Sequence, residues 1–188
     1  MRRFKVAVVG ATGVVGRELL GILAERDFPI AKLTLLASAR SKGKPVEFKG
    51  EVLCVDEVSE DAIAGHDIAF FAAGASVSRE FAKGAAQNGA LVIDNSSAFR
   101  MDPEVPLVVP QVNPEDILKH KGIIANPNCT TTIMVMALKP IDDAAVVKRA
   151  VVSTYQAVSG AGLKAMEALL HESKAYLAGE AVQPEILP

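Results

Sequence analysis

The sequence predicts an α/β fold, a Rossmann-like doubly wound parallel sheet followed by the start of a second, α+β domain. Three observations predict it. Short apolar runs alternate with helical stretches along the chain, and three glycines follow the first run at regular spacing. About 60 residues follow Cys129, which is fewer than a typical domain contains. We therefore expect the second domain to be incomplete.

Composition excludes several classes of protein. Half of the 188 residues are apolar and 22% are charged, which is typical of a globular chain with a buried core. The formal charge of -2 argues against nucleic acid or an anionic membrane as a partner. The two cysteines lie far apart, so neither a disulfide framework nor a metal site is expected. No apolar run approaches the ~18 residues of a membrane span, and we expect a cytoplasmic protein.

Six apolar runs are predicted strands. Their richness in Val, Ile, Leu and Phe is typical of parallel strands that are buried on both faces. Helices are predicted between and after them, from apolar stripes and terminal capping signals. The predicted strands are Phe4–Val9, Leu33–Ala37, Ile68–Ala72, Leu91–Asp94, Gly122–Ala125 and Ala150–Ala157. The predicted helices are Val14–Arg26, Ser76–Asn88, a helix capped by Asn113, Thr130–Leu138 and Gly162–Ala178.

The glycines after the first strand predict a dinucleotide site. In a strand–turn–helix of this kind the first glycine makes the tight turn, the second lets the backbone approach a pyrophosphate, and the third lets the helix pack on the strand. The spacing is G-x-x-G-x-x-G, and a purely structural turn is the alternative. The expected cofactor contacts are Gly10, Thr12, Gly13, Val14, Val15 and Gly16.

The end of the second strand favours NADP(H) over NAD. An NAD site usually carries an acid there to hold the ribose 2′-hydroxyl. No Asp or Glu occurs from Phe28 through Val46, whereas Ser38 and Arg40 follow the strand. A hydroxyl and a guanidinium can hold a 2′-phosphate by hydrogen bonds and charge. The alternative is a solvated basic loop.

A candidate nucleophile lies in Asn126–Thr131. With Asn128 as the cap, Cys129 falls in the first turn of a helix, where free amides and the helix dipole stabilise a thiolate. The same amides can receive the oxyanion of a thiohemiacetal. The alternative is a buried inert cysteine, which is how we interpret Cys54.

Two further polar residues follow predicted strands. Arg100 comes after the strand that ends at Asp94 and suits a planar or phosphate-bearing anion. Gln156 ends the last predicted strand, and its uncharged amide can orient a carbonyl. Taken alone, Arg100 could instead be a surface ion pair and Gln156 an ordinary polar strand residue.

Together the segments Gly10–Gly16, Asp94–Arg100, Asn126–Thr131 and Ser153–Gly162 resemble the aspartate-semialdehyde dehydrogenase family. The resemblance implies NADPH-dependent reductive dephosphorylation of L-aspartyl-4-phosphate to L-aspartate-4-semialdehyde, in the biosynthesis of lysine, methionine, threonine and, in bacteria, diaminopimelate. It implies an acyl-phosphate substrate, release of inorganic phosphate, and a homodimer or tetramer. The implied roles are attack on the acyl phosphate for Cys129, substrate orientation for Gln156, substrate binding for Arg100, Asn95, Ser97, Asn128 and Gly160, and cofactor binding for Ser38, Arg40 and Ser159.

The resemblance also divides the chain. It implies an NADP-binding domain at residues 1–128, and a catalytic-cysteine helix with an incomplete substrate or dimerisation domain at 129–188. The family's acid/base histidine and carboxylate-binding arginine lie later than this sequence reaches. His66, His120 and His171 match no such motif, and we expect His171 on the surface. We therefore predict an incomplete form that turns over poorly or not at all.

Other functions stay open on the sequence alone. N-acetyl-glutamyl-phosphate reductase shares the chemistry but has a different cysteine segment. A malonyl-CoA reductase-like enzyme also stays open, because the choice of substrate depends partly on the half of the family's chain that this sequence does not contain. A non-catalytic NADP-binding homologue would keep the fold without the reaction. The presence of both Cys129 and Gln156 disfavours that last alternative.

Overall fold

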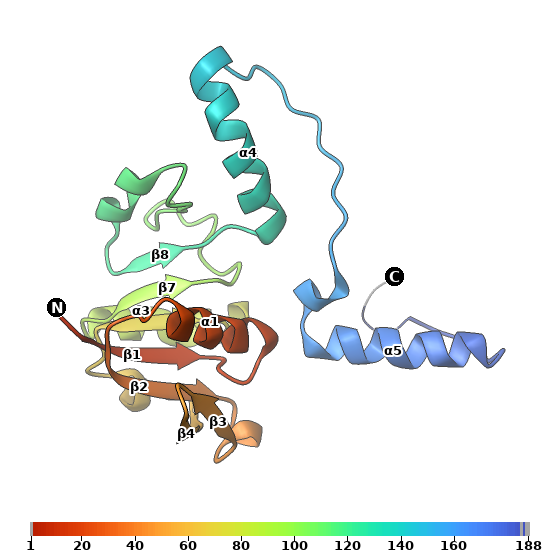
Figure 1. Ribbon diagram of the computed structural model, residues 1–188, viewed down its shortest axis with the longest axis horizontal. Helices are drawn as coiled ribbons and strands as arrows, with labels where there is room; N and C mark the ends of the chain where they lie inside the picture. Colours follow the sequence, from red (N-terminus) through yellow and green to blue (C-terminus); the bar gives the residue numbers. More distant parts are fainter. Residues whose placement is uncertain (1, 185, 187–188) are drawn as a thin grey trace. The chain divides into compact units, whose positions relative to one another are not determined.

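The computed structural model describes residues 2–184 and 186. Residues 1, 185, 187 and 188 lie outside the described part of the chain. The chain divides into two compact units, one ending at Ala150 and the other beginning at Val151. The first unit contains a six-stranded parallel sheet, whose labelled arrows point the same way in Figure 1.

The sheet has the strand order β5-β2-β1-β6-β7-β8. Its order reverses between β1 and β6, and in doubly wound sheets ligands bind at the carboxyl ends of the strands at such a switch point. Five predicted strands are confirmed, with ends shifted by up to three residues. The strands are β1 Phe4–Val9, β2 Ile30–Ala37, β5 Asp56–Glu57, β6 Ile68–Phe71, β7 Leu91–Asp94 and β8 Ile123–Ala125.

Helices connect the strands. The predicted helices over residues 14–26 and 76–88 are confirmed within one residue, and Gly89 ends the second with a φ of +91°. The α-helices are α1 Val14–Glu25, α2 Glu60–Ile63, α3 Ala75–Gln87, α4 Cys129–Ala145 and, in the second unit, α5 Leu163–Leu177. Short 3-10 helices are η1 Ala39–Ser41, η2 Pro114–Lys119 and η3 Val158–Ala161.

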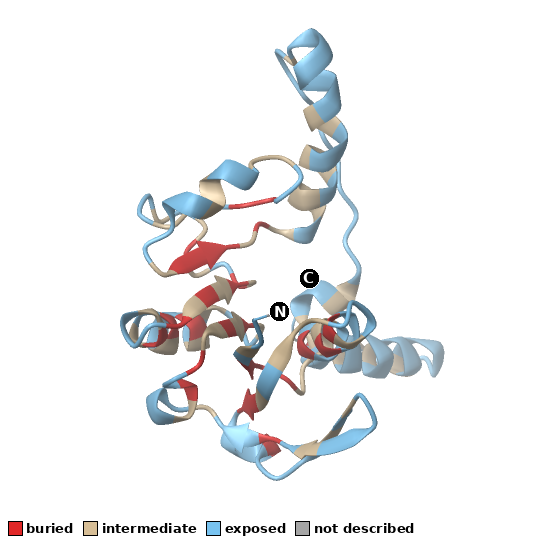
Figure 2. Ribbon diagram, turned by 60° about the vertical axis from the view of Figure 1, so that its left-hand side comes forward, coloured by how far each residue is buried: buried red, intermediate tan, exposed pale blue. Residues whose placement is uncertain are grey.

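The core lies on both faces of the sheet, because successive side chains of a strand point to opposite faces. Ala7 and Val9 of β1 belong to a cluster with residues of α2 and α3, whereas Val6 and Val8 belong to one with residues of α1. Figure 2 shows the buried residues concentrated in the strands. On the α1 face an apolar groove of about 460 Å³ has Phe70 among its lining residues.

The predicted strand at Ala150–Ala157 is wrong. Residues 150–157 contain no strand, and residues 150–157 are exposed. A strand needs a neighbour for its backbone N–H and C=O groups, and the structure pairs no described strand with this segment. Apolar composition alone therefore misled the prediction.

A second difference is an unpredicted hairpin, β3 Pro45–Phe48 with β4 Glu51–Cys54. Lys49 and Gly50 form its two-residue loop, both with positive φ, as a tight turn between twisted strands requires. Because this hairpin exposes Cys54, our interpretation of that cysteine as buried is wrong. Its thiol is therefore open to reagents.

The predicted cap at Asn113 is also wrong. Pro114 and two acids do open a helix there, but it is the 3-10 helix η2 and its N-terminus has no side-chain cap. The Asn113 side chain instead accepts from Val109 N and donates to the Leu107 carbonyl, at 2.9 and 3.0 Å.

Among the described residues, no helix is both long and apolar enough to cross a membrane.

Candidate active site

The glycine turn lies at the switch point of the sheet. Gly10 has a φ of +90°, and a Cβ added to it would lie 2.7 Å from the backbone carbon of Ala72, after β6. A Cβ on Gly16 would lie 2.2 Å from the Gly10 carbonyl oxygen. Gly10 therefore allows the turn and the close approach to the β6–α3 loop, and Gly16 lets α1 pack against the turn.

The N-terminus of α1 is open to an anion. Gly13 is its N-cap residue, and no described side chain caps the helix. The first amides of a helix and its dipole together favour a phosphate. A hydrogen bond of 3.4 Å from Thr12 Oγ1 to Ser41 Oγ joins this turn to the segment after β2. Sequence reasoning did not single out Ser41.

Ser38 and Arg40 lie in this segment after β2 and are both exposed. Ser38 is the N-cap residue of η1, and its carbonyl accepts from Ser41 N at 2.8 Å. Of the neighbouring cations, Lys42 pairs with Glu57 on β5 at 3.9 Å. Arg40 has no ion-pair partner among the described residues, so its charge is available to a ligand.

Cys129 is the first residue of α4 and is exposed. Asn128 caps the helix as predicted, because its Oδ1 accepts from Thr130 N at 3.0 Å. The Cys129 Sγ lies 4.0 Å from the same Oδ1. The predicted placement of the thiol at a helix N-terminus is therefore confirmed, and its role as a nucleophile stays a prediction.

Arg100 is half-buried and is held by two main-chain carbonyls. Its Nε donates to the Asn126 carbonyl at 2.9 Å and its Nη2 to the Asn95 carbonyl at 3.1 Å. Asn95 is half-buried and Ser97 is exposed on the same loop. The structure thus brings Arg100 and Asn95 together with the segment that leads into Cys129.

Asp94 is a residue that sequence reasoning passed over. It ends β7 and its side chain is fully buried. It accepts hydrogen bonds from Ser78 Oγ at 2.7 Å, Ser96 Oγ at 2.8 Å and Ser96 N at 3.1 Å. A carboxylate closing a buried strand, with a serine two residues later, was the signal that could have found it.

Gln156, Ser159 and Gly160 belong to the second unit. Gln156 is exposed, and Ser159 and Gly160 lie in η3. A Cβ added to Gly160 would lie 2.2 Å from Gln156 Nε2, so the glycine leaves room for the glutamine side chain. The structure thus brings these two residues together, while the roles assigned to all three stay predictions.

Two of the histidines have clear surroundings. His171 is exposed, as predicted. His66 is buried and its ring nitrogens contact the Ile63 carbonyl and Thr34 Oγ1, both at 2.8 Å. Such contacts are those of a structural histidine. Among the described residues, no group of three or more His, Cys, Asp or Glu side chains is placed to hold a metal.

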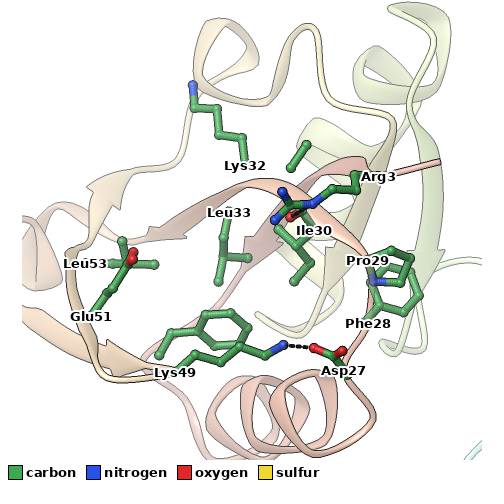
Figure 3. A pocket seen from close by; sticks show the side chains of 12 residues that line it. Arg3, Asp27, Phe28, Pro29, Ile30, Lys32, Leu33, Lys49, Glu51 and Leu53 are labelled. Atoms are coloured by element: carbon green, nitrogen blue, oxygen red, sulfur yellow. Dashed lines mark hydrogen bonds and ion pairs between the residues drawn. The ribbon is translucent and has the colours of Figure 1, made fainter. Parts of the chain in front are cut away.

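A cavity of about 740 Å³ lies elsewhere, between β2 and the β3–β4 hairpin (Figure 3). Its wall carries the ion pair of Asp27 with Lys49, which holds the pKa of the Asp27 carboxyl below its usual value through the lysine hydrogen bond and charge. None of the predicted site residues lines this cavity. The candidate site is therefore the row of strand ends, where the predicted site residues of the first unit lie.

Comparison with known families matches both parts of the chain. Residues 5–120 match the semialdehyde dehydrogenase NAD binding domain, and residues 138–188 match the semialdehyde dehydrogenase dimerisation domain.

Individual relatives agree. Aspartate-semialdehyde dehydrogenase of Aquifex aeolicus is 58% identical over 94% of this chain and 53% of its own length. The crystal structure of aspartate semialdehyde dehydrogenase II complexed with ASA from Vibrio cholerae is 45% identical with a TM-score of 0.94, over 100% of this chain and 56% of that one. The Candida albicans enzyme with NADP is 26% identical with a TM-score of 0.62, over 78% and 48%. The chain thus spans about half the length of the relatives it matches.

Proposed function

Because the chain belongs to the semialdehyde dehydrogenase family, we propose that it carries the cofactor site and nucleophile of an aspartate-semialdehyde dehydrogenase. The reaction is the NADPH-dependent reductive dephosphorylation of L-aspartyl-4-phosphate to L-aspartate-4-semialdehyde. The observation that carries the proposal is the exposed Cys129 at the capped N-terminus of α4, in a chain 46–58% identical to aspartate-semialdehyde dehydrogenases. Those identities favour this substrate over N-acetyl-glutamyl phosphate or malonyl-CoA.

Cys129 starts the chemistry in this proposal. Its thiolate attacks the acyl carbon of the substrate, a C–S bond forms, and the C–O bond to phosphate breaks with release of inorganic phosphate. NADPH, when bound, supplies the hydride that reduces the thioester. The amides at the start of α4 stabilise the oxyanion, and the C–S bond then breaks to release the aldehyde and regenerate the thiolate of Cys129.

The remaining site residues bind and orient the substrate. Main-chain carbonyl oxygens, rather than a carboxylate, accept the hydrogen bonds of the Arg100 guanidinium. We assign this guanidinium to the phosphate of the substrate. We assign Asn95 and Ser97 to the same substrate site. Gln156 orients the acyl group, with Asn128 and Gly160 beside the substrate.

The cofactor of this proposal is NADP(H). The open N-terminus of α1 receives the pyrophosphate, and the exposed Ser38 and Arg40 hold the 2′-phosphate. The Candida albicans relative solved with NADP supports this choice. We assign the cofactor contacts to Gly10, Thr12, Gly13, Val14, Val15, Gly16, Ser38, Arg40 and Ser159.

The wider context follows from the same reaction. We propose that residues 1–128 form the cofactor domain, that residues 129–188 begin the catalytic and dimerisation part, and that the protein is a homodimer or tetramer. The match to a dimerisation domain supports an oligomer. We also propose that the reaction serves the biosynthesis of lysine, diaminopimelate, threonine and methionine in the cytoplasm.

The cofactor proposal predicts a preference between nucleotides. In a fluorescence titration of this chain we expect NADPH to bind at least about tenfold more tightly than NADH, a difference of about 1.4 kcal/mol. Arg40→Ala should remove most of the preference, because it removes the exposed guanidinium after β2. Lys44→Ala is the matched control for loss of basic charge in the same loop, and it should keep the preference. Equal binding of the two nucleotides by the unmodified chain would contradict the assignment.

The nucleophile proposal predicts a difference between two exposed cysteines. With iodoacetamide at pH 7 and site-resolved mass spectrometry, we expect Cys129 to react at least about tenfold faster than Cys54, because only Cys129 lies at a helix N-terminus. Asn128→Ala should slow alkylation of Cys129 and leave the rate at Cys54 unchanged. Equal rates at the two thiols would favour a non-catalytic homologue.

A further inference from the structure

Two loops hold the guanidinium of Arg100 between them. The Asn95 carbonyl belongs to the loop after β7, and the Asn126 carbonyl belongs to the segment after β8. Each loop contributes one acceptor, so the position of the guanidinium depends on the distance between the loops. Whatever joins the loops therefore positions Arg100.

The side chain of Asn126 joins these loops. Its Nδ2 donates to Asn95 Oδ1 at 2.5 Å, and its backbone N donates to the Asp94 carbonyl at 2.8 Å. A single substitution of Asn126 can remove the side-chain bond between the loops. The two backbone carbonyls that accept from Arg100 would remain after that substitution. Asn126 also lies only two residues before the Asn128 cap of α4. The same link thus relates Arg100 to the helix that begins with Cys129.

Asp94 holds one side of this arrangement in place. Its buried carboxylate receives Ser78 Oγ from α3 and both Oγ and N of Ser96. The Ser96 hydroxyl in turn accepts from Ala98 N at 3.0 Å. These bonds fix the backbone on both sides of Asn95, whose carbonyl contacts Arg100. A buried carboxylate satisfied by several donors is rigid, because each lost bond would leave a buried polar atom unpaired.

We infer that Asn126 and Asp94 are positioning residues that hold Arg100 beside the N-terminus of α4, where its charge meets the phosphate of an acyl-phosphate substrate. Neither side chain needs to touch the substrate. The inference rests on the proposed function, because it takes the ligand of Arg100 to be a phosphate.

Protection of Cys129 by inorganic phosphate tests the inference in this chain. The rate of alkylation of Cys129 by iodoacetamide is followed against phosphate concentration, and the half-protecting concentration is compared between variants. Asn126→Ala should raise that concentration about tenfold. In a chain that already carries Arg100→Ala, adding Asn126→Ala should change the half-protecting concentration less than about twofold. Asn126 acts through Arg100 in this inference, and the effects of coupled residues do not add. Asn88→Ala, at an exposed asparagine, is the matched control and should have no effect.

A second variant guards against a folding defect. Ser96→Ala leaves the Asp94 carboxylate with two of its three donors, Ser78 Oγ and the backbone N of residue 96. This variant should also raise the half-protecting concentration, and the increase should again depend on Arg100. Both variants should bind NADPH as the unmodified chain does. Protection that is equal in the unmodified chain and in the Asn126→Ala and Ser96→Ala variants would overturn the inference alone. No protection by phosphate in the unmodified chain would overturn it together with the assignment of Arg100 to the substrate phosphate.

Discussion

At the residue scale, Gly10 is required both for its backbone conformation and for its close approach to neighbouring backbone atoms. Gly10 has a φ that side chains rarely adopt, and an added Cβ would lie 2.7 Å from backbone atoms that cannot swing aside. We expect Gly10→Ala to lower the free energy of unfolding by about 3 kcal/mol, from backbone strain plus this contact. Urea denaturation measures it. Gly21→Ala, in the middle of α1 with open space around it, is the control and should raise stability by up to ~1 kcal/mol.

At the element scale, Asp67 joins the beginnings of β1 and β6. Its Oδ2 accepts from Lys5 N at 2.8 Å and its Oδ1 pairs with Arg2 at 3.1 Å. The Lys5 backbone hydrogen bond, followed by Arg2, holds the pKa of the Asp67 carboxyl below its usual value. A carboxyl with a lowered pKa in the folded state contributes stability above its unfolded pKa, about 3.9, and loses it as the pH falls through the folded pKa.

Acid denaturation of two variants checks this role of Asp67. In Asp67→Asn, the free energy of unfolding should be lower than that of the unmodified chain at pH 6, and the difference should close below pH ~3. Arg2→Ala should keep most of the pH dependence, because the Lys5 hydrogen bond is the larger cause. A difference that stays constant from pH 6 to pH ~3 would contradict the account.

At the scale of the whole molecule, almost all of the described core lies in the unit that ends at Ala150. Among the buried apolar residues, only Ala165 belongs to the second unit. A chain that ends at Ala150 should therefore keep its free energy of unfolding within about 1 kcal/mol, while its affinity for NADPH should fall by the contribution of Ser159, the one assigned cofactor contact that it lacks. Urea denaturation and the nucleotide titration measure both, and a clear loss of stability would show that the second unit contributes to the core.

The sequence identified features whose signal is local. Short continuous apolar runs, typical of parallel strands buried on both faces, marked strands such as Phe4–Val9, and an apolar stripe at helical spacing marked α1. The glycine spacing indicated the turn at Gly10, and Asn128 before a helical stretch indicated the cap that places Cys129. Each of these depends on neighbours within a few residues, so a single chain contains the information.

Only the tertiary structure decided what depends on residues far apart in the chain. The segment 150–157 has the composition of a strand, but no described strand pairs with it. Cys54 lies in an apolar run, but the hairpin leaves it exposed. Arg100 takes its position from carbonyls of two separate loops, and Asp94 binds a serine sixteen positions away. Hydrogen bonding and burial across the sheet, rather than local pattern, set these features.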